Sequence, residues 1–144
     1  MKASIVTLFA ILISTFAMAQ EQYLSPKDVP GIVKSTFLIK FPDATNPKWE
    51  KENDNYEVTF TNDKEVQSAI LDSSGNLIQT EVKITKDQLP HSILPYVKVN
   101  YRRKKIREVA KITDVKGKVF YEVEIYKKDL IFDHKGNFVK EIEK

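Results

Sequence analysis

The 144-residue sequence predicts an α+β protein in which a helical segment is followed by a four-stranded antiparallel meander, and this tandem pattern occurs twice. Three observations support the prediction. Helix-start residues precede apolar residues spaced four apart, and short alternating runs bounded by turn residues come next. The same order of signals then recurs after about sixty residues, which is typical of an internal duplication. The helices are expected to pack on one face of the sheet.

Three pairs of segments carry the duplication. In chain order they are Leu24 to Pro30 with Ile84 to Pro90, Tyr56-Glu57-Val58 with Tyr121-Glu122-Val123, and Asp72-x-x-Gly75-Asn76 with Asp133-x-x-Gly136-Asn137. The spacing between partners changes only by amounts that loops can absorb. We therefore expect residues 20–144 to consist of two repeats, about 24–83 and 84–144.

Each repeat should begin with a single helical turn. Ser25 and Thr85 are suitable N-cap residues, because a hydroxyl oxygen can accept a hydrogen bond from an unpaired backbone N–H group. Gln88 stands three residues after Thr85, as in a capping box, and Asp28 has the same place after Ser25.

A longer helix should follow in each repeat. Pro30 and Pro90 suit the first helical position, where no backbone N–H group is needed. Apolar residues then recur every four positions: Val33, Phe37 and Phe41 in the first repeat, and Ile93, Val97 and Tyr101 in the second. Pro42 should end the first helix, whereas Pro95 lies inside the second and should kink it or displace its start.

Four short strands joined by hairpin turns should complete each repeat, and the two meanders are expected to fuse into one sheet. The runs are 48–52, 56–60, 66–71 and 77–82 in the first repeat, and 108–112, 119–126, 129–133 and 138–142 in the second.

Alternation within these strands assigns their two faces. The side chains expected under the helices are Tyr56, Val58, Phe60, Tyr121, Val123 and Ile125. If the helices cover only one side, the other side is an open sheet face that could bind a ligand. Its candidate binding residues are Glu57, Thr59, Ile70, Glu122, Glu124 and Tyr126.

The N-terminus is typical of a secretory signal peptide spanning residues 1–19. Lys2 precedes a charge-free, mostly apolar stretch, and Ala17-Met18-Ala19 forms a small-x-small site after which we expect cleavage. The alternative, an uncleaved anchor, is disfavoured because the charge-free stretch from Ala3 to Gln20 barely reaches the ~20 residues that span a bilayer. The chain has no Cys, so neither a lipoprotein anchor nor a disulfide is expected. These features predict a periplasmic or secreted protein without a stable membrane anchor.

Composition and motifs argue against catalysis. The two histidines, His91 near a helix start and His134 in a turn, are interpreted as surface residues, and no nucleophile or phosphate-binding motif occurs. The Asp-x-x-Gly segments at Asp72 and Asp133 are explained by β-turns, because a calcium loop needs more oxygen ligands. A net charge of +3, from 23 Lys+Arg and 20 Asp+Glu, is too small for a nucleic-acid binder. We expect no enzyme, cofactor, metal or nucleic-acid partner.

A basic cluster, Arg102-Arg103-Lys104-Lys105, is the sharpest charge feature, and Arg107 follows it. Adjacent cations can bind phosphate or carboxylate groups, for example on lipopolysaccharide or an acidic protein patch. The favoured interpretation is a solvated connection between helix and strand. Trp49 is likewise interpreted as a packing residue rather than a binding platform.

The module Ser/Thr-x-x-Asp/Gln-Val/Leu-Pro, aromatic helix end, Tyr-Glu-Val, Asp-x-x-Gly-Asn resembles the PepSY-like, β-lactamase-inhibitor-protein-like (BLIP-like) domain of secreted bacterial proteins. Residues 41–51, FPDATNPKWEK, followed by Tyr56-Glu57-Val58, are especially typical. The resemblance covers about residues 24–144. It implies a tandem helix-plus-four-strand fold, export to the periplasm, and a role in binding or inhibiting proteins. The second repeat departs from the pattern at Pro95 and has Ala110 nearest to the place of Trp49.

The leading hypothesis is a non-catalytic binding module of the bacterial envelope. Its open sheet face would engage a protein or peptide partner, in the manner of a peptidase or hydrolase inhibitor. The alternative is a structural or stress-related periplasmic protein without a discrete ligand, which could associate through exposed sheet edges.

Overall fold

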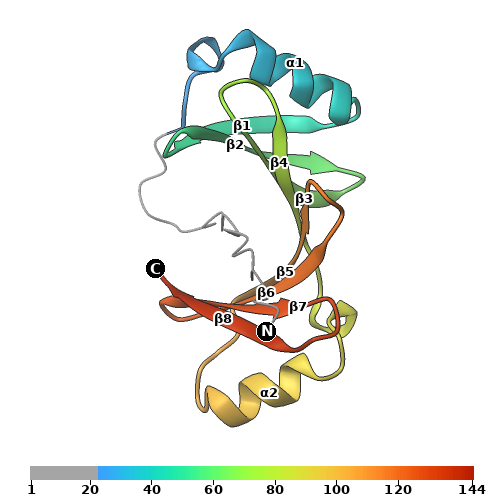
Figure 1. Cartoon of the computed structure of the whole chain (residues 1–144), viewed down its shortest axis with the longest axis vertical. Coiled ribbons are helices and arrows are strands. Elements are labelled where there is room, and N and C mark those ends of the chain that lie inside the picture. Colours follow the sequence, from blue (N-terminus) through green and yellow to red (C-terminus); the bar gives the residue numbers. More distant parts are fainter. Residues whose placement is uncertain (1–22) are drawn as a thin grey trace, which may run out of the picture.

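The computed structural model describes residues 23–144, so the expected signal peptide and its cleavage site lie outside the described residues. The chain folds as an α+β protein with one eight-stranded antiparallel sheet (Figure 1). The elements in chain order are the 3-10 helix η1 (Pro26–Asp28), α1 (Gly31–Lys40), β1 (Thr45–Glu52), β2 (Asn55–Asn62), β3 (Glu65–Leu71), β4 (Leu77–Lys83), the 3-10 helix η2 (Lys86–Gln88), α2 (Ile93–Asn100), β5 (Glu108–Asp114), β6 (Val119–Ile125), β7 (Lys128–Asp133) and β8 (Phe138–Glu143).

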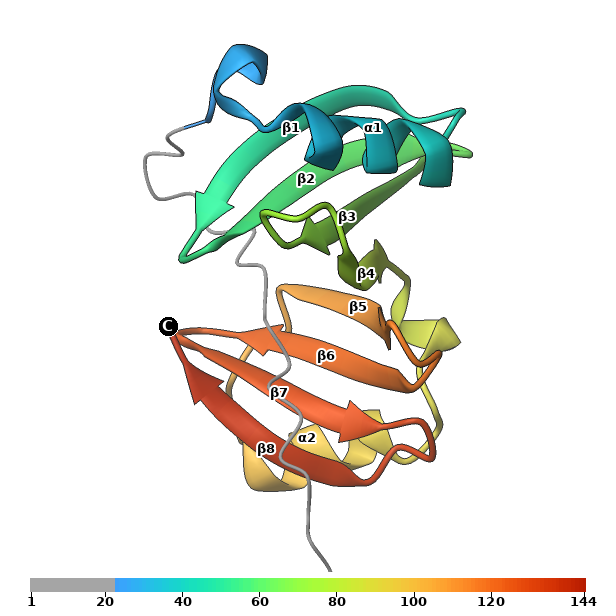
Figure 2. The same ribbon diagram turned by 45° about the horizontal axis from the view of Figure 1, so that its top comes forward.

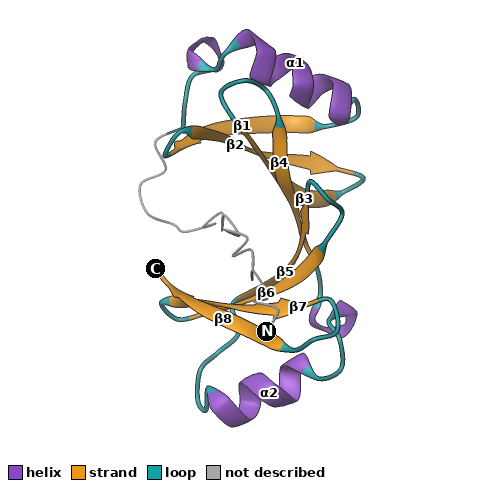
Figure 3. Cartoon of the chain, viewed as in Figure 1, coloured by secondary structure: helices purple, strands orange, loops and turns teal. Residues whose placement is uncertain are grey.

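The strands lie in the sheet in the same order as in the chain, from β1 at one edge to β8 at the other (Figure 3). Strands β4 and β5 pair directly, with Lys83 opposite Ala110 and Gln79 opposite Asp114, although η2 and α2 lie between them in the sequence. The expectation that all strands join in one sheet is therefore confirmed. We call residues 24–83 the N-terminal half and residues 84–144 the C-terminal half.

The sheet is strongly curved, and both helices lie on its convex side, one at each end (Figures 1 and 2). Each helix packs through the predicted apolar stripe: Val33 and Phe37 on α1 and Ile93 and Val97 on α2 are buried. The predicted inner strand residues join the same two cores, listed by half as Tyr56, Val58 and Phe60, and as Tyr121, Val123 and Ile125. Trp49 is also buried in the first core, which agrees with a packing role.

The helix starts confirm some predictions and correct others. The two single turns are present as η1 and η2, and Thr85 and Gln88 form the predicted capping box, in which the Thr85 backbone N–H donates to Gln88 Oε1 over 2.8 Å, whereas Ser25 makes no side-chain cap hydrogen bond. Pro30 is the N-cap of α1 rather than its first helical residue, and α2 begins at Ile93 instead of Pro90. The second shift is the displacement predicted from Pro95, because in a helix starting at residue 90 its ring would clash with a carbonyl one turn earlier. In the observed helix it lies in the first turn, where no N–H group is required.

Two hairpin turns repeat the same side-chain geometry. Oδ1 of Asp72 accepts hydrogen bonds of 2.9 Å from the backbone N–H groups of Ser74 and Asn76, and Asp133 makes the same contacts in the other half. The Asn76 side chain holds the pKa of Asp72 below its usual range. These carboxylates are therefore engaged in their own turns, as the β-turn interpretation predicts.

Candidate functional site on the concave face

The strand register defines which side chains share the concave face of the sheet. Glu57 is opposite Ile70 on neighbouring strands, and Glu122 is opposite Ile131. Residues directly opposite each other in an antiparallel pair lie on the same face. The strand neighbours Val58 and Val123 lie in the cores under the helices, so these four side chains point away from the helices. We call this side the concave face.

The structure places the predicted binding residues in three separate positions. Glu57, Thr59 and Ile70 lie on β2 and β3, whereas Glu122 and Glu124 lie on β6. Four strand spacings separate β2 from β6, or roughly 19 Å along the sheet. The predicted residues thus lie in two separate parts of one face, and the prediction included no residue of β4 or β5 between them.

Tyr126 is outside the strand, because β6 ends at Ile125. Its ring is 53% exposed and lies near three cations: the centroid is 6.0 Å from Lys104 Nζ, 5.3 Å from Arg107 Cζ and 5.4 Å from Lys127 Nζ. The predicted strand 119–126 was therefore one residue too long. The left-handed backbone of Lys127 turns the chain at this point. Tyr126 thus lies just beyond the end of β6, beside the basic loop and beside Arg107, which also approaches Glu124.

Five carboxylates come together on the concave face of the C-terminal half and the adjoining strand β4. We call them the carboxylate cluster: Glu81, Glu108, Glu122, Glu124 and Asp129. Glu124 lies directly opposite Glu108 on one neighbouring strand and Asp129 on the other. Like charges in such positions are destabilising unless cations compensate them.

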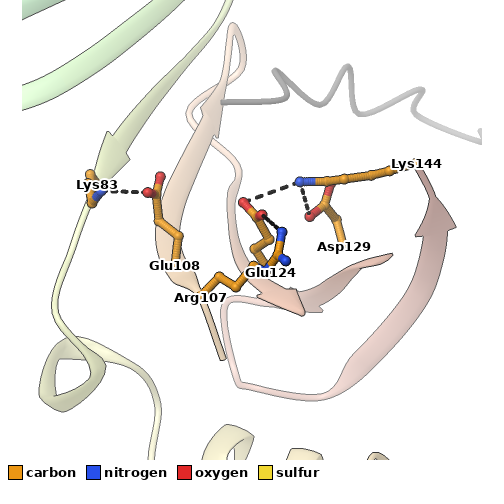
Figure 4. Close-up of polar contacts among 6 residues, drawn as sticks. All are labelled: Lys83, Arg107, Glu108, Glu124, Asp129 and Lys144. Atoms are coloured by element: carbon orange, nitrogen blue, oxygen red, sulfur yellow. Dashed lines mark hydrogen bonds and ion pairs between the residues drawn. The ribbon is translucent and has the colours of Figure 1, made fainter. Parts of the chain in front are cut away.

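Three cations compensate part of this charge (Figure 4). Lys144 Nζ is 3.2 Å from Glu124 Oε2 and 3.0 Å from Asp129 Oδ1. Arg107 approaches Glu124 Oε1 at 3.9 Å, and Lys83 pairs with Glu108. Glu108, Glu124 and Asp129 are thus each paired with a cation.

Glu122 differs from these three paired carboxylates. It is buried, and within the described part of the chain its Oε2 has no hydrogen-bond partner. Burial raises the pKa of Glu122 far above its usual range, and the neighbouring carboxylates of Glu81 and Asp129 raise it further. Burial also raises the pKa of Asp129, although Lys144 opposes the shift. These shifts favour the protonated, neutral form of the Glu122 carboxyl group near pH 7.

Apolar side chains interleave with the carboxylate cluster. We call them the apolar cluster: Ile112, Phe120, Ile131 and Ile142. Ile131 lies opposite Glu122, and Ile142 lies opposite Asp129. The concave face of the C-terminal half therefore alternates acidic and apolar groups over short distances.

The two histidines lie apart from the carboxylate cluster. His91 and His134 are both exposed on the convex side or in a turn, away from the carboxylate cluster. The described residues include no group of three or more His, Cys, Asp or Glu that could hold a metal ion. No helix among them is long and apolar enough to cross a membrane.

Sequence reasoning missed most of the carboxylate cluster. Glu81 and Glu108 could have been assigned to the concave face from strand alternation, once β4 and β5 were known to pair. Lys144 gave no sequence signal, because it is the last residue and meets Glu124 and Asp129 only through the β6–β7–β8 pairing.

The sequence matches the model of a known family. A family model described as "Putative beta-lactamase-inhibitor-like, PepSY-like" matches residues 16–79 and 54–140. The two matches span most of the sequence, so the chain belongs to this family, as the resemblance predicted. The family is described by likeness to an inhibitor rather than by a reaction. No curated protein matches the chain.

Two solved structures illustrate the likeness. One is described as "putative periplasmic proteins" from Bacteroides eggerthii DSM 20697; it has a TM-score of 0.71 and 12% identity, covering 80% of this chain and 88% of that one. The other is a BLIP-like protein from Bacteroides fragilis NCTC 9343, with a TM-score of 0.66 and 20% identity, covering 85% and 89%. At these identities the likeness concerns the fold.

Proposed function

We propose that this protein is a non-catalytic binding module of the bacterial envelope and that its ligand is a protein or peptide segment. The segment would present a Lys or Arg side chain beside apolar side chains to the concave face. We also propose that residues 1–19 are a cleaved signal peptide, and that residues 20–144 are a tandem repeat of two helix-plus-four-strand units. The description of one structural neighbour as periplasmic supports export.

The observation that carries this proposal is the interleaving of the carboxylate and apolar clusters around Glu122. Ion pairs join Glu108, Glu124 and Asp129 to Lys83, Arg107 and Lys144, whereas Glu122 is buried and its Oε2 has no hydrogen-bond partner among the described residues. An incoming ammonium or guanidinium group would favour the ionised form of Glu122, form a charge-assisted hydrogen bond with it and offset its repulsion with Glu81 and Asp129. Ile112, Phe120 and Ile131 are themselves buried, so the half-buried Ile142 is the member of the apolar cluster that would contact apolar groups of the same segment.

The family description supports an inhibitor-like role for this protein, with a peptidase or hydrolase as its partner. A sheet face holds its side chains in fixed positions, which lowers the entropy cost of binding a partner. Because one fold can serve many functions, the identity of the partner must be tested directly.

The alternative, a structural protein that associates through its sheet edges, is less well supported. The edge strand β1 contains Pro47 and a register irregularity between Thr45 and Lys48. The other edge, β8, alternates apolar residues with Lys140, Glu141 and Glu143. Proline, bulges and charged residues are the usual features that prevent edge-to-edge pairing.

Fluorescence anisotropy with two labelled peptides tests the proposal. One peptide alternates Lys and Leu, the other Glu and Leu, at equal length. We expect the protein to bind only the Lys/Leu peptide, and E122A/E124A to weaken that binding at least about tenfold. The matched control D43A/E65A removes two exposed carboxylates away from the concave face and should leave the affinity unchanged.

Two results would contradict the proposed function. Equal binding of both peptides would show that charge does not select the ligand. Equal weakening by E122A/E124A and D43A/E65A would show that net charge, rather than the carboxylate cluster, attracts the peptide.

A further inference from the structure

A second surface, on the opposite side of the sheet, has the reverse charge. A groove of about 460 Å³ lies between η2, α2 and the loop that connects α2 to β5. Four of its lining residues are apolar or aromatic: Leu94, Val97, Tyr101 and Ile106. The other five are basic: Lys86, Lys98, Arg103, Lys104 and Lys105. We call this site the basic groove.

The cations of the basic groove have no carboxylate partners. Within residues 23–144, none of these five side chains forms an ion pair, whereas Lys83, Arg107, Lys128 and Lys144 all do. Grouping five like charges around one hollow is unfavourable unless an anion or solvent compensates them. The lining contains no acidic residue, so the groove is complementary to a negative ligand.

The fold does not require this loop to be basic. In the N-terminal half, three residues, Pro42, Asp43 and Ala44, make the equivalent connection between α1 and β1 without a cation. In the C-terminal half six residues, 102–107, separate the helix cap from β5, and five of them are basic. The fold can therefore make this connection with fewer residues and without basic side chains.

The backbone of this loop also presents its cations in an unusual way. Arg103 has φ of 63°, in the left-handed region that side chains other than Gly seldom occupy. Lys104, which lines the groove, and the neighbouring Arg107 both approach the ring of Tyr126. Tyr126 thus contacts the basic loop.

The apolar lining distinguishes the expected ligand from a simple anion. Leu94 is half-buried and Val97 is buried in the second core, so the base of the groove is continuous with apolar packing. Ligand sites commonly have volumes of about 300–1,000 Å³, with apolar walls and a few polar groups that fix orientation. The alkyl stems of lysines can cover an apolar chain while their ammonium groups hold an anionic head.

We propose that the basic groove binds a single-chain anionic amphiphile, with its phosphate or carboxylate head among Arg103, Lys104 and Lys105 and its acyl chain against Leu94 and Val97. This site is independent of the concave face. The fold therefore carries an acidic surface for a basic segment and a basic surface for an amphiphile, on opposite sides of one sheet.

Isothermal titration calorimetry of the exported protein with dodecyl phosphate, below its micelle-forming concentration, tests this proposal. We expect one molecule to bind per chain. Inorganic phosphate should bind at least about a hundredfold more weakly, because it lacks the chain that contacts Leu94. Dodecylphosphocholine, whose head has no net charge, should bind at least about tenfold more weakly than dodecyl phosphate.

Variants separate the head from the chain. R103E/K105E should weaken dodecyl phosphate binding at least about tenfold, whereas K64E/K135E, which reverses two exposed turn cations elsewhere, should not. L94N should weaken dodecyl phosphate binding and leave that of inorganic phosphate unchanged. Circular dichroism would confirm that each variant is folded.

Three outcomes would overturn the proposal. Equally tight binding of inorganic phosphate would mean that the apolar lining has no role. Equal losses in R103E/K105E and K64E/K135E would indicate nonspecific attraction. Binding to anionic phosphatidylglycerol vesicles without binding of monomeric dodecyl phosphate would indicate a membrane surface contact instead.

Discussion

The two halves of the molecule use one backbone plan with different interiors. In the N-terminal half, Phe37 is surrounded by aromatic rings, with centroids 5.0 Å from Phe60, 5.4 Å from Trp49 and 5.7 Å from Phe41. The equivalent position in the C-terminal half is Val97, in a mostly aliphatic core. This framework therefore depends on the spacing of apolar residues and much less on which apolar residues are used.

The halves also differ in where charge gathers. The carboxylate cluster, its compensating cations and the basic groove all lie in the C-terminal half or at its border with β4. Both proposed binding surfaces therefore depend mainly on one half, while the other extends the sheet. Substitutions at equivalent positions can test this difference between the halves.

The largest expected effect concerns the aromatic core. Phe37→Ala should lower the free energy of unfolding by about 3–5 kcal/mol, because it removes a fully packed ring and leaves a cavity. Val97→Ala, its equivalent, should cost only about 1.6 kcal/mol, for two methyl groups at about 0.8 kcal/mol each. Urea unfolding would measure both. Phe37→Leu, which retains volume but not ring contacts, provides a folded comparison if Phe37→Ala does not fold. Equal costs at both positions would mean that the halves are packed alike.

A second comparison uses the equivalent turn glycines, which both have φ of 83°. An added Cβ at Gly136 would overlap Ser92 Oγ and lie 2.8 Å from Pro90 Cβ, whereas at Gly75 the closest atoms are Ile32 Cγ1 at 2.9 Å and the Ile32 carbonyl oxygen at 3.1 Å. The Ile32 side chain is exposed and can move. We expect Gly75→Ala to cost about 1–2 kcal/mol, mainly from backbone strain, and Gly136→Ala about 1 kcal/mol more. Thermal unfolding would rank them, and the reverse order would contradict the packing argument.

A third test sharpens the contrast within the carboxylate cluster. Because the pKa of Glu122 is raised in the folded state, folding favours its protonated form. Stability should therefore fall as pH rises above about 4.3, the usual pKa of Glu, toward the raised folded value. Glu122→Gln should remove this dependence and raise the free energy of unfolding at pH 7 by about 1 kcal/mol or more.

Glu124→Gln is the matched control for this pH experiment. Glu124 has ion pairs with Lys144 and Arg107, so its neutralisation should lower stability at pH 7. Urea unfolding at pH 5 and pH 8 measures both variants. A Glu122→Gln protein that is less stable than the parent at pH 8 would show that this carboxylate is compensated.

The smallest expected effect concerns the residues that cap the two helices, Phe41 and Tyr101. The Tyr101 hydroxyl donates a 2.7 Å hydrogen bond to Glu141 Oε2, which Phe41 cannot make. Burial, followed by this contact with Glu141, raises the pKa of Tyr101 to about 12. Tyr101→Phe should cost at most about 0.5 kcal/mol, because water screens the contact. In a spectrophotometric titration the variant should lose the tyrosine that ionises last. A titration unchanged above pH 11 would contradict the assignment.

The sequence by itself determined the order of elements and the apolar side of each. Alternation at 56–60 and 119–126, and the four-residue spacing of Val33, Phe37 and Phe41, were sufficient because each pattern depends only on local backbone geometry. The turn aspartates were also predictable, since Asp72 and Asp133 bind backbone groups within four residues. Family membership followed from the same local motifs.

Only the tertiary structure decided which local features meet. Pairing of β4 with β5 across an intervening helix brings Glu81 and Lys83 to the carboxylate cluster, and the pairing of β6, β7 and β8 brings Lys144 to Glu124. These outcomes rest on contacts between residues far apart in the chain, whose geometry is set by strand register and sheet curvature rather than by any local pattern.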